Sequence, residues 1–226
     1  MMSLPHASLS AFVLAGGRSS RMGTDKALLR LCGKPLIKHC VAKLRLLTHD
    51  VRILSSEAAL ASYAPLLADI HPNIGPIGGL ESALAHTTTD WNLFLPVDMP
   101  FLPADLLGLW LKHALIAPAA ARIHLLQTED GRAQPCPCLL HRQLLPHLSQ
   151  AIARSEYKLM QAFQSANVEV SITPLDEFTG TLTPRQRAAQ HLWFANLNTP
   201  QDVAEAEANC LALDPIPGVI RAADAS

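Results

Sequence analysis

Short apolar runs alternate with longer amphipathic segments along most of the chain. The apolar runs have the length of buried strands, whereas apolar residues between them recur at the spacing of one helix face. Alternation of this kind is typical of βαβ units around a parallel sheet. We therefore predict an α/β protein with a mostly parallel central sheet. The predicted strands are Leu9–Ala15, Val51–Leu54, the vicinity of Leu67–Asp69, Trp91–Val97, Arg122–Gln127 and Val168–Ile172.

The amphipathic segments predict six helices. The first starts at Pro35, because proline suits the first position of a helix. Leu36, Cys40 and Leu44 follow it at helical spacing. The other predicted helices are Gly79–His86, Pro103–Leu115, Arg142–Ala153, Tyr157–Ser165 and Pro200–Leu211.

Length and composition fit one globular domain. The chain has 226 residues, of which 49% are hydrophobic and 16% charged, so it can bury one sizeable core. We assign residues 1–213 to this domain. Residues 214–226 carry two prolines and several alanines, and we expect them to form a flexible C-terminal tail.

Charge and hydropathy exclude several classes of partner. The formal net charge is −1 and no run of like charges stands out, which argues against nucleic acid or a membrane surface as a partner. No stretch reaches the ~20 apolar residues of a membrane helix. The N-terminal segment also lacks the positive charge that opens a secretory signal. We expect a cytoplasmic protein.

The five cysteines are odd in number and mostly scattered, which fits reduced thiols in a cytosolic protein. We expect no disulfide framework. Cys136 and Cys138 form the one close pair, but no second pair or histidine at ligand spacing accompanies them. A zinc site is therefore not predicted.

A glycine-rich segment follows the first predicted strand directly. Gly16 and Gly17 end that strand and bring bare backbone N–H groups into a concave turn that can cradle a phosphate. Arg21 and Lys26 add the positive charge that a polyphosphate needs. Residues 14–26 are therefore a candidate anion site.

Two commoner glycine motifs do not fit this segment. A Walker A loop requires Lys and then Ser or Thr directly after its last glycine, whereas Gly23 is followed by Thr24 and Asp25. A dinucleotide fingerprint requires G-x-G-x-x-G, and that spacing is absent after Gly16. A plain turn with solvated cations remains the structural alternative.

An acidic residue closes the fourth predicted strand. Asp98 stands between Pro96 and Pro100, after the apolar run Trp91–Val97. A rigid carboxylate opposite a phosphate cradle is what Mg²⁺ needs from a protein. The alternative is an N-cap for the helix near Pro103. In a parallel sheet the loops after successive strands meet at one edge, so we expect Asp98 and the glycine-rich turn to face one site.

Three further polar positions are candidates. Asp69, at the end of the third apolar run, could accept hydrogen bonds from a base or sugar, or be a solvated loop residue. Asn196 and Asn198 share one face by alternation and could bind a polar substrate.

Thr199 is a plausible helix N-cap. The glycine-rich turn at residues 75–79 leads into a helix and could contribute amides to a nucleotide site.

Taken together, these segments resemble the molybdenum cofactor guanylyltransferase family, a branch of the nucleotidyltransferase superfamily. The resemblance spans roughly Ser8–Leu211 and implies a Rossmann-like, three-layer nucleotidyltransferase fold. The segments that carry it are Leu14–Gly17, Arg21–Gly23, Asp25–Lys26, Gly33–Leu36, Gly75–Pro76, Pro96–Pro100 and Asn196–Pro200.

The resemblance also implies roles for individual residues. Asp98 would bind Mg²⁺ and nucleotide, and Lys26 would bind GTP. The charge that builds on a leaving pyrophosphate adds Arg21, so that Arg21, Lys26 and Asp98 form the expected catalytic set. Ser55 stands near a position where the family often has asparagine. The implied nucleotide ligands are Leu14, Ala15, Gly16, Gly17, Lys26, Ser55, Asp69 and Asp98, and the implied pterin side is Gln134, Asn196 and Asn198.

The reaction implied by the resemblance transfers GMP from GTP to the terminal phosphate of molybdopterin or the molybdenum cofactor. Pyrophosphate leaves, and the guanine dinucleotide cofactor forms, with molybdoenzymes or their chaperones as further partners. A phosphate monoester is already an anion near neutral pH, so no side-chain general base is required. The protein must position two anions and supply cations for the leaving pyrophosphate.

Three alternatives remain open. A CTP-dependent molybdopterin cytidylyltransferase usually carries Leu-Ala-Ala-Gly where this chain has Leu-Ala-Gly-Gly, so Gly17 argues mildly against it. Another small nucleotidyltransferase of the superfamily is the second. The third is a non-catalytic, nucleotide-binding cofactor-insertion protein, which intact Lys26 and Asp98 make the least favoured.

Overall fold

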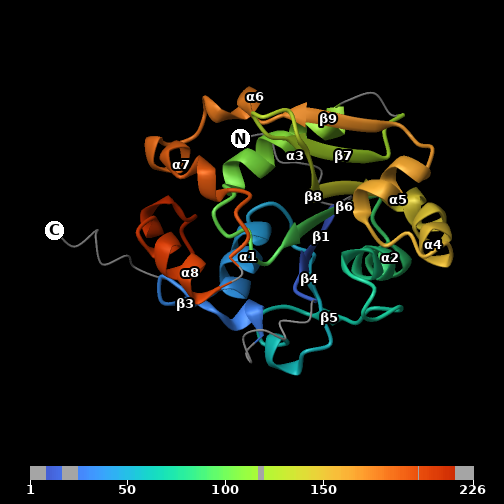
Figure 1. Cartoon of the computed structure of the whole chain (residues 1–226), viewed down its shortest axis with the longest axis horizontal. Helices are drawn as coiled ribbons and strands as arrows, with labels where there is room; N and C mark the ends of the chain where they lie inside the picture. Colours follow the sequence, from blue (N-terminus) through green and yellow to red (C-terminus); the bar gives the residue numbers. More distant parts are fainter. Residues whose placement is uncertain (1–8, 17–24, 117–119, 198, 217–226) are drawn as a thin grey trace.

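The computed structural model describes residues 9–16, 25–116, 120–197 and 199–216, and it is built around a seven-stranded sheet (Figure 1). The strand order is β5-β4-β1-β6-β8-β7-β9. All neighbouring pairs are parallel except the two that β8 makes. The strands are β1 (Leu9–Leu14), β4 (Val51–Leu54), β5 (Leu66–Leu67), β6 (Trp91–Pro96), β7 (Ile123–Gln127), β8 (Ala133–His141) and β9 (Val170–Pro174); β2 (Arg30–Leu31) and β3 (Lys34–Pro35) form a separate hairpin. The predicted α/β class with a mostly parallel sheet is confirmed.

Helices cover both faces of the sheet, which gives three layers. Side chains alternate along β1, so Ala11 and Val13 join the core under α1 and α3, whereas Phe12 joins the core under α2. Figure 1 shows α2, α4 and α5 grouped together at the right of the view. The helices are α1 (Leu36–Arg45), α2 (Pro76–His86), α3 (Ala104–Ile116), α4 (Leu145–Ala153), α5 (Leu159–Ser165), α6 (Asp176–Thr179), α7 (Pro184–Ala188) and α8 (Pro200–Glu207).

One strand of the sheet, the nine-residue β8 between β6 and β7, is absent from the predicted strands. Its prolines, Pro135 and Pro137, argue against a central strand because proline cannot donate to the ladder. In the structure, both prolines lie where the pairing of β8 with β7 is irregular. Pairing with β7 jumps from Cys138 to Gln134, so the prolines fall within an irregular stretch that contains the cis Cys136–Pro137 bond.

Four predicted helices differ from the observed ones by two or more residues at one end. The helix predicted for Arg142–Ala153 begins at Leu145, after a 3₁₀ turn, and the one predicted for Tyr157–Ser165 begins at Leu159. The helix predicted to start at Gly79 begins at Pro76, after Gly75 with φ of 83°. The helix predicted for Pro200–Leu211 ends at Glu207 and is followed by a separate 3₁₀ turn, Cys210–Ala212. Thr199 caps α8 as expected, since its side chain accepts from Asp202 N–H while the Asp202 carboxylate accepts from Thr199 N–H.

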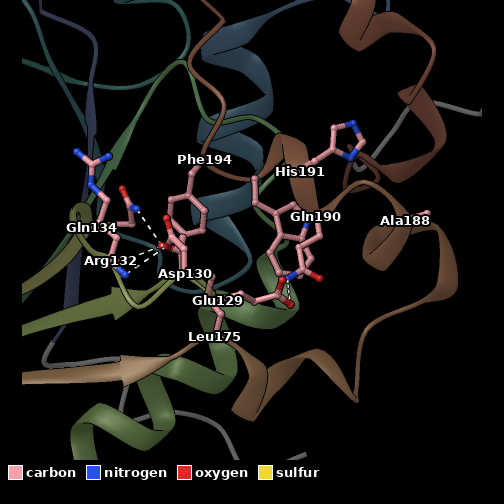
Figure 2. A pocket seen from close by; sticks show the side chains of 11 residues that line it. Glu129, Asp130, Arg132, Gln134, Leu175, Ala188, Gln190, His191 and Phe194 are labelled. Carbon is pink, nitrogen blue, oxygen red and sulfur yellow. Dashed lines mark hydrogen bonds between the residues drawn. The ribbon is translucent and has the colours of Figure 1, made fainter.

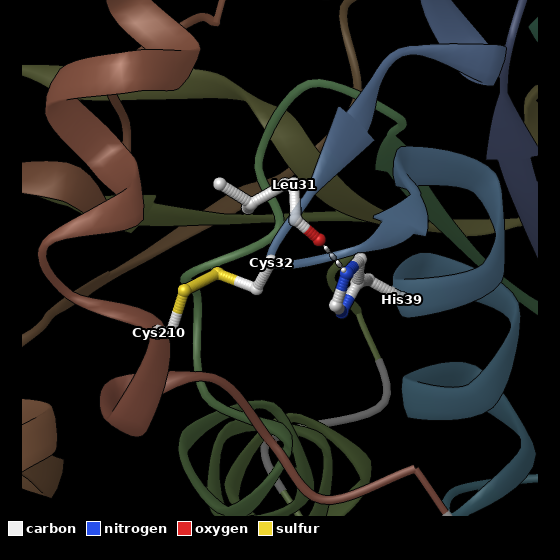
Figure 3. Close-up of a disulfide and its surroundings, with 4 residues drawn as sticks. All are labelled: Leu31, Cys32, His39 and Cys210. Carbon is white, nitrogen blue, oxygen red and sulfur yellow. Dashed lines mark hydrogen bonds between the residues drawn. A yellow bond between two sulfur atoms is a disulfide. The ribbon is translucent and has the colours of Figure 1, made fainter.

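The expectation of no disulfide is wrong, because Cys32 and Cys210 are bonded to each other (Figure 3). Cys32 lies between β2 and β3, and Cys210 lies just after α8, with 5.8 Å between their Cα atoms. The bond spans 178 residues of sequence, so spacing gave no signal for it. Packing of α8 against β2 brings the two together. Cys40, Cys136 and Cys138 are free and buried, as expected of structural thiols.

Packing continues one residue past the predicted domain boundary at residue 213. The side chain of Asp214 is 11% exposed and accepts a hydrogen bond from Ala104 N–H at the start of α3. Within the described ranges, none of the helices is long and apolar enough to cross a membrane.

Candidate active site

The carboxyl edge of the sheet brings together residues that are far apart in the chain. Leu14 of β1 is paired with Pro96 of β6 and with Leu54 of β4, and Leu54 is paired with Leu67 of β5. Gly16 stands two residues beyond Leu14, Asp98 two residues beyond Pro96, and Asp69 two residues beyond Leu67. All three therefore lie just past the ends of neighbouring parallel strands, where ligands bind in open α/β sheets.

Lys26 and Asp98 meet directly at this edge. Lys26 Nζ is 2.6 Å from Asp98 Oδ2, and their side chains are 21% and 17% exposed. Lys26 begins a short 3₁₀ turn that the Asp25 side chain caps by accepting from Ala27 N–H at 2.9 Å. This cap fixes the backbone from which the Lys26 side chain reaches the sheet edge. Lysine and aspartate, predicted to face one site, are in contact.

Asp98 is held by its backbone as well. Its carbonyl accepts a hydrogen bond from Leu197 N–H at 3.4 Å, and the preceding carbonyl of Val97 accepts from the Cys40 thiol of α1 at 3.4 Å. The alternative in which Asp98 caps the helix near Pro103 does not hold, because Asp214 accepts from the first amide of that helix.

Asp69 lies between the glycine-rich strand end and α2. A Cβ atom on Gly79 would lie 3.5 Å from one carboxylate oxygen of Asp69, and one on Gly16 would lie 3.9 Å from the other. Partial burial raises the pKa of Asp69 above its ordinary value. The side chain of Ser55 lies nearby but is buried, and its hydroxyl accepts from Glu57 N–H at 3.1 Å.

Three predicted site residues, Gly17, Arg21 and Asn198, lie outside the described residues. Asn196 is exposed and directly precedes Leu197, whose N–H contacts the Asp98 carbonyl. Gln134 stands at the beginning of β8. Its partner across the sheet is Leu126 of β7.

Gln134 also lines a cavity of about 580 Å³ between the β7–β8 turn and the segment that follows α7. Figure 2 shows Gln134, Arg132 and Asp130 on one wall and Gln190 and His191 on the other. A hydrogen bond of 2.7 Å from Gln190 Nε2 to Glu129 Oε1 joins the two walls. The lining residues are Thr128, Glu129, Asp130, Arg132, Gln134, Leu175, Ala188, Gln190, His191, Trp193 and Phe194.

Of the residues that line this cavity, the resemblance names Gln134 alone. Its second wall comes from α7 and the turn after it, which carry no local motif. One lining residue is the fully buried Trp193, whose indole N–H has no hydrogen-bond partner within the described structure.

Comparison with known proteins decides the class. The family model for the MobA-like NTP transferase domain matches residues 11–170. The chain belongs to this family. As a member of the MobA-like family it is a nucleotidyltransferase.

Relatives and a solved structure agree with this assignment to the MobA-like family. Molybdenum cofactor guanylyltransferase of Vibrio cholerae serotype O1 is 32% identical over 198 residues, which cover 85% of this chain and 88% of the relative. The protein of the same name from Serratia proteamaculans is 33% identical over 204 residues, with 87% and 93% covered. Molybdopterin-guanine dinucleotide biosynthesis protein A from Archaeoglobus fulgidus has the same fold, with a TM-score of 0.72 at 23% identity over 90% of this chain and 100% of that one.

The fit of this site to a metal ion depends on the oxygen ligands that it offers. Among the described residues, no group of three or more His, Cys, Asp or Glu side chains could enclose an ion. Asp98 is the carboxylate at the sheet edge opposite Lys26. Mg²⁺ is commonly bound by one or two carboxylates together with substrate phosphates and water. Asp98 therefore fits a magnesium ion that a nucleoside triphosphate brings with it.

Proposed function

We propose that this nucleotidyltransferase transfers GMP from GTP to the terminal phosphate of molybdopterin or the molybdenum cofactor. Pyrophosphate would leave, and the guanine dinucleotide form of the cofactor would be passed to molybdoenzymes or their chaperones. The names of the relatives support the choice of substrates. The structural observation that carries the proposal is the Lys26–Asp98 contact of 2.6 Å beside Gly16 at the carboxyl edge of the sheet.

The residues at this edge suit transfer to a phosphate nucleophile. The acceptor needs no general base, because a phosphate monoester is already ionised near neutral pH. Lys26 and Asp98 hold each other in place before substrate binds, and the triphosphate would take over Lys26 as its partner. Magnesium held by Asp98 would offset the negative charge that gathers on the leaving pyrophosphate. Arg21 is proposed to add a bidentate contact to the phosphates.

Asp69 and Ser55 are proposed to face the nucleoside part of GTP. The Asp69 carboxylate lies beside Gly16, with one oxygen 3.9 Å from the place of a Cβ atom on that glycine, so a nucleotide bound at the glycine-rich strand end would be within its reach. A carboxylate can accept hydrogen bonds from ribose hydroxyls or from a guanine amino group. Burial of Asp69 against Gly79 fixes its position for such a contact.

The cavity beside Gln134 is proposed to take the pterin. It lies on the opposite side of Asp98 from Asp69, so a nucleotide and an acceptor could approach Asp98 from two sides. A pterin carries several ring donors and acceptors, which match the carboxylates and amides of Glu129, Asp130 and Gln190. Asn196 and Asn198 are proposed to contact the acceptor on the path from this cavity to Asp98.

The experiment that tests the function is a pyrophosphate-release assay with GTP, CTP, ATP and UTP. Each nucleotide is supplied with and without molybdopterin, and with Mg²⁺ or with EDTA. We expect release with GTP only, and only when both molybdopterin and Mg²⁺ are present. Preferential turnover of CTP would contradict the guanylyl assignment, and tight GTP binding without release would favour a non-catalytic role.

A further inference from the structure

A buried ion pair lies behind the turn that carries Asp98. Lys43 of α1 is 1% exposed, and its Nζ donates to the carbonyl of Pro100 at 2.6 Å and also to the carbonyl of Leu102. The same ammonium is 3.2 Å from Asp214 Oδ2. A buried ammonium is costly unless it is paired and hydrogen-bonded. The three oxygens around Lys43 meet that requirement.

Asp214 connects the C-terminal segment to the start of α3. Both of its carboxylate oxygens lie 3.2 Å from the backbone nitrogen of Ala104, the first residue of that helix. A carboxylate at this position satisfies an amide that has no partner within the helix and interacts favourably with the helix dipole. The carboxylate therefore joins α3 to the Lys43 ammonium of α1.

These contacts enclose the turn from residue 97 to residue 104. Cys40, one helical turn before Lys43 on the same face of α1, donates to the Val97 carbonyl. Lys43 holds Pro100 and Leu102, and Asp214 holds Ala104. Asp98 is the residue of this turn whose side chain reaches Lys26. The contacts of Lys43 and Asp214 therefore hold the backbone that follows Asp98.

We propose that Lys43 and Asp214 are positioning residues that hold the Asp98 carboxylate in its productive place opposite Lys26. Neither touches Asp98, and both act through the backbone of residues 97–104. The inference rests on the proposed role of Asp98 in binding nucleotide and metal. Asp214, which lies in the segment predicted to be a flexible tail, would thus affect catalysis.

Three variants separate positioning from simple stabilisation. Lys43→Met leaves Asp214 without its cation, and Asp214→Asn leaves the ammonium without its anion, so each should lower the thermal unfolding midpoint. The double variant Lys43→Met/Asp214→Asn contains neither buried charge, so part of the lost stability should return. The carbonyls of Pro100 and Leu102 still lack their donor in the double variant, so Asp98 remains displaced.

Pyrophosphate release is measured on the full-length variants at a temperature where each is folded, with kcat, KM and the Mg²⁺ concentration for half-maximal rate as readouts. We expect Lys43→Met and the double variant to share a loss of about 10- to 100-fold in kcat, since a misplacement of about 1 Å costs on the order of 10²-fold. Both should need more Mg²⁺, with the KM for molybdopterin unchanged. Lys112→Met, an exposed lysine on α3, is the matched control.

Recovery of kcat and Mg²⁺ dependence together with stability in the double variant would overturn the proposal, as would single variants with the kinetics of Lys112→Met. Should Lys43→Met not fold alone, the double variant carries the same comparison. Asp98→Asn, assayed under the same conditions, separates the proposed role of Asp98 from the proposed positioning role of Lys43 and Asp214. Wild-type turnover in Asp98→Asn would contradict the role of Asp98 itself, whereas its loss combined with normal Lys43 variants would contradict only the positioning role.

Discussion

Lys26 and Asp98 lie 72 residues apart in the chain and 2.6 Å apart in space. The sequence predicted that they face one site, because each follows the end of a strand in a parallel sheet. It did not show what holds them there. Lys43, Asp214 and Cys40 belong to no motif, and their contacts with the backbone of residues 97–104 exist only once α1 and the C-terminal segment have packed.

Asp69 gives a pH-dependent prediction at the scale of one residue. Burial raises the pKa of its carboxyl in the folded state, so the folded protein holds this proton more tightly than the unfolded chain does. The contribution of Asp69 to stability is therefore fully present below the ordinary pKa of aspartate and is lost as pH rises through the raised value. We expect Asp69→Asn to be more stable than the wild type at pH 7, with the gain vanishing in acid, while its affinity for GTP falls.

Urea unfolding at pH 7 and at about pH 3 measures this effect, and Asp130→Asn supplies a control of opposite sign. Hydrogen bonds from the Thr128 hydroxyl and the Arg132 amide lower the pKa of Asp130, so that its stabilising contribution is present at pH 7 and is lost as pH falls. An Asp69→Asn variant that loses stability at pH 7, as Asp130→Asn should, would contradict the account of Asp69.

At the scale of elements, the sequence located the strands and helices whose periodicity is clear. Val51–Leu54 has the predicted bounds, and β1 and β6 differ from their predictions by one residue at the carboxyl end. The failures have physical causes. The prolines of β8 concealed a strand whose ladder is broken where they occur. The short helices α6 and α7 have too few residues for a periodic pattern to be visible.

The first turn of α2 gives a prediction at this scale. A Cβ atom on Gly78 would lie 2.6 Å from the backbone oxygen of His71, so an alanine there must push α2 away from the preceding turn. We expect Gly78→Ala to lose about 1 to 3 kcal/mol of unfolding free energy and to bind GTP more weakly, because Asp69 packs against the same turn. Gly180→Ala is the control, since nothing lies within 4 Å of its added Cβ.

Denaturant unfolding of both glycine variants measures the difference in stability. The structure requires Gly180→Ala to remain close to the wild type and Gly78→Ala to fall well below it. Equal midpoints for the two variants would mean that the close approach of α2 to His71 is absent in solution.

For the molecule as a whole, the alternation of strands and helices along the sequence predicts the parallel sheet. The contacts of the C-terminal segment with the rest of the fold could not be predicted in this way. The C-terminal segment reaches the site-bearing regions at two places, through the Cys32–Cys210 bond to the β2–β3 hairpin and through Asp214 to α1 and α3. Both contacts join residues that are 110 or more positions apart in the chain. Neither the spacing of the residues nor the charge pattern indicates these contacts. Composition alone therefore predicts a flexible tail and reduced thiols.

The disulfide predicts a redox-dependent stability of the whole fold. A cross-link that closes a loop of 178 residues restricts the unfolded chain, which corresponds to about 5 kcal/mol in the chain-entropy model. We expect a reductant to lower the urea midpoint of the wild type and to leave Cys210→Ser unchanged. Thiol titration of the denatured, unreduced chain should count the three free cysteines Cys40, Cys136 and Cys138. Five reactive thiols, or a wild-type midpoint indifferent to reductant, would contradict the bond.

The central claim is that Lys26 and Asp98 form the centre of a nucleotidyl transfer site, and substitution of each tests it most directly. The measurement is pyrophosphate release from GTP with molybdopterin and Mg²⁺ by Lys26→Ala and Asp98→Ala, beside their thermal unfolding midpoints. The account predicts midpoints close to the wild type and a loss of ~10²- to 10³-fold in turnover for each variant, the usual effect of removing one fixed electrostatic contact. Near-normal turnover in either variant would contradict it.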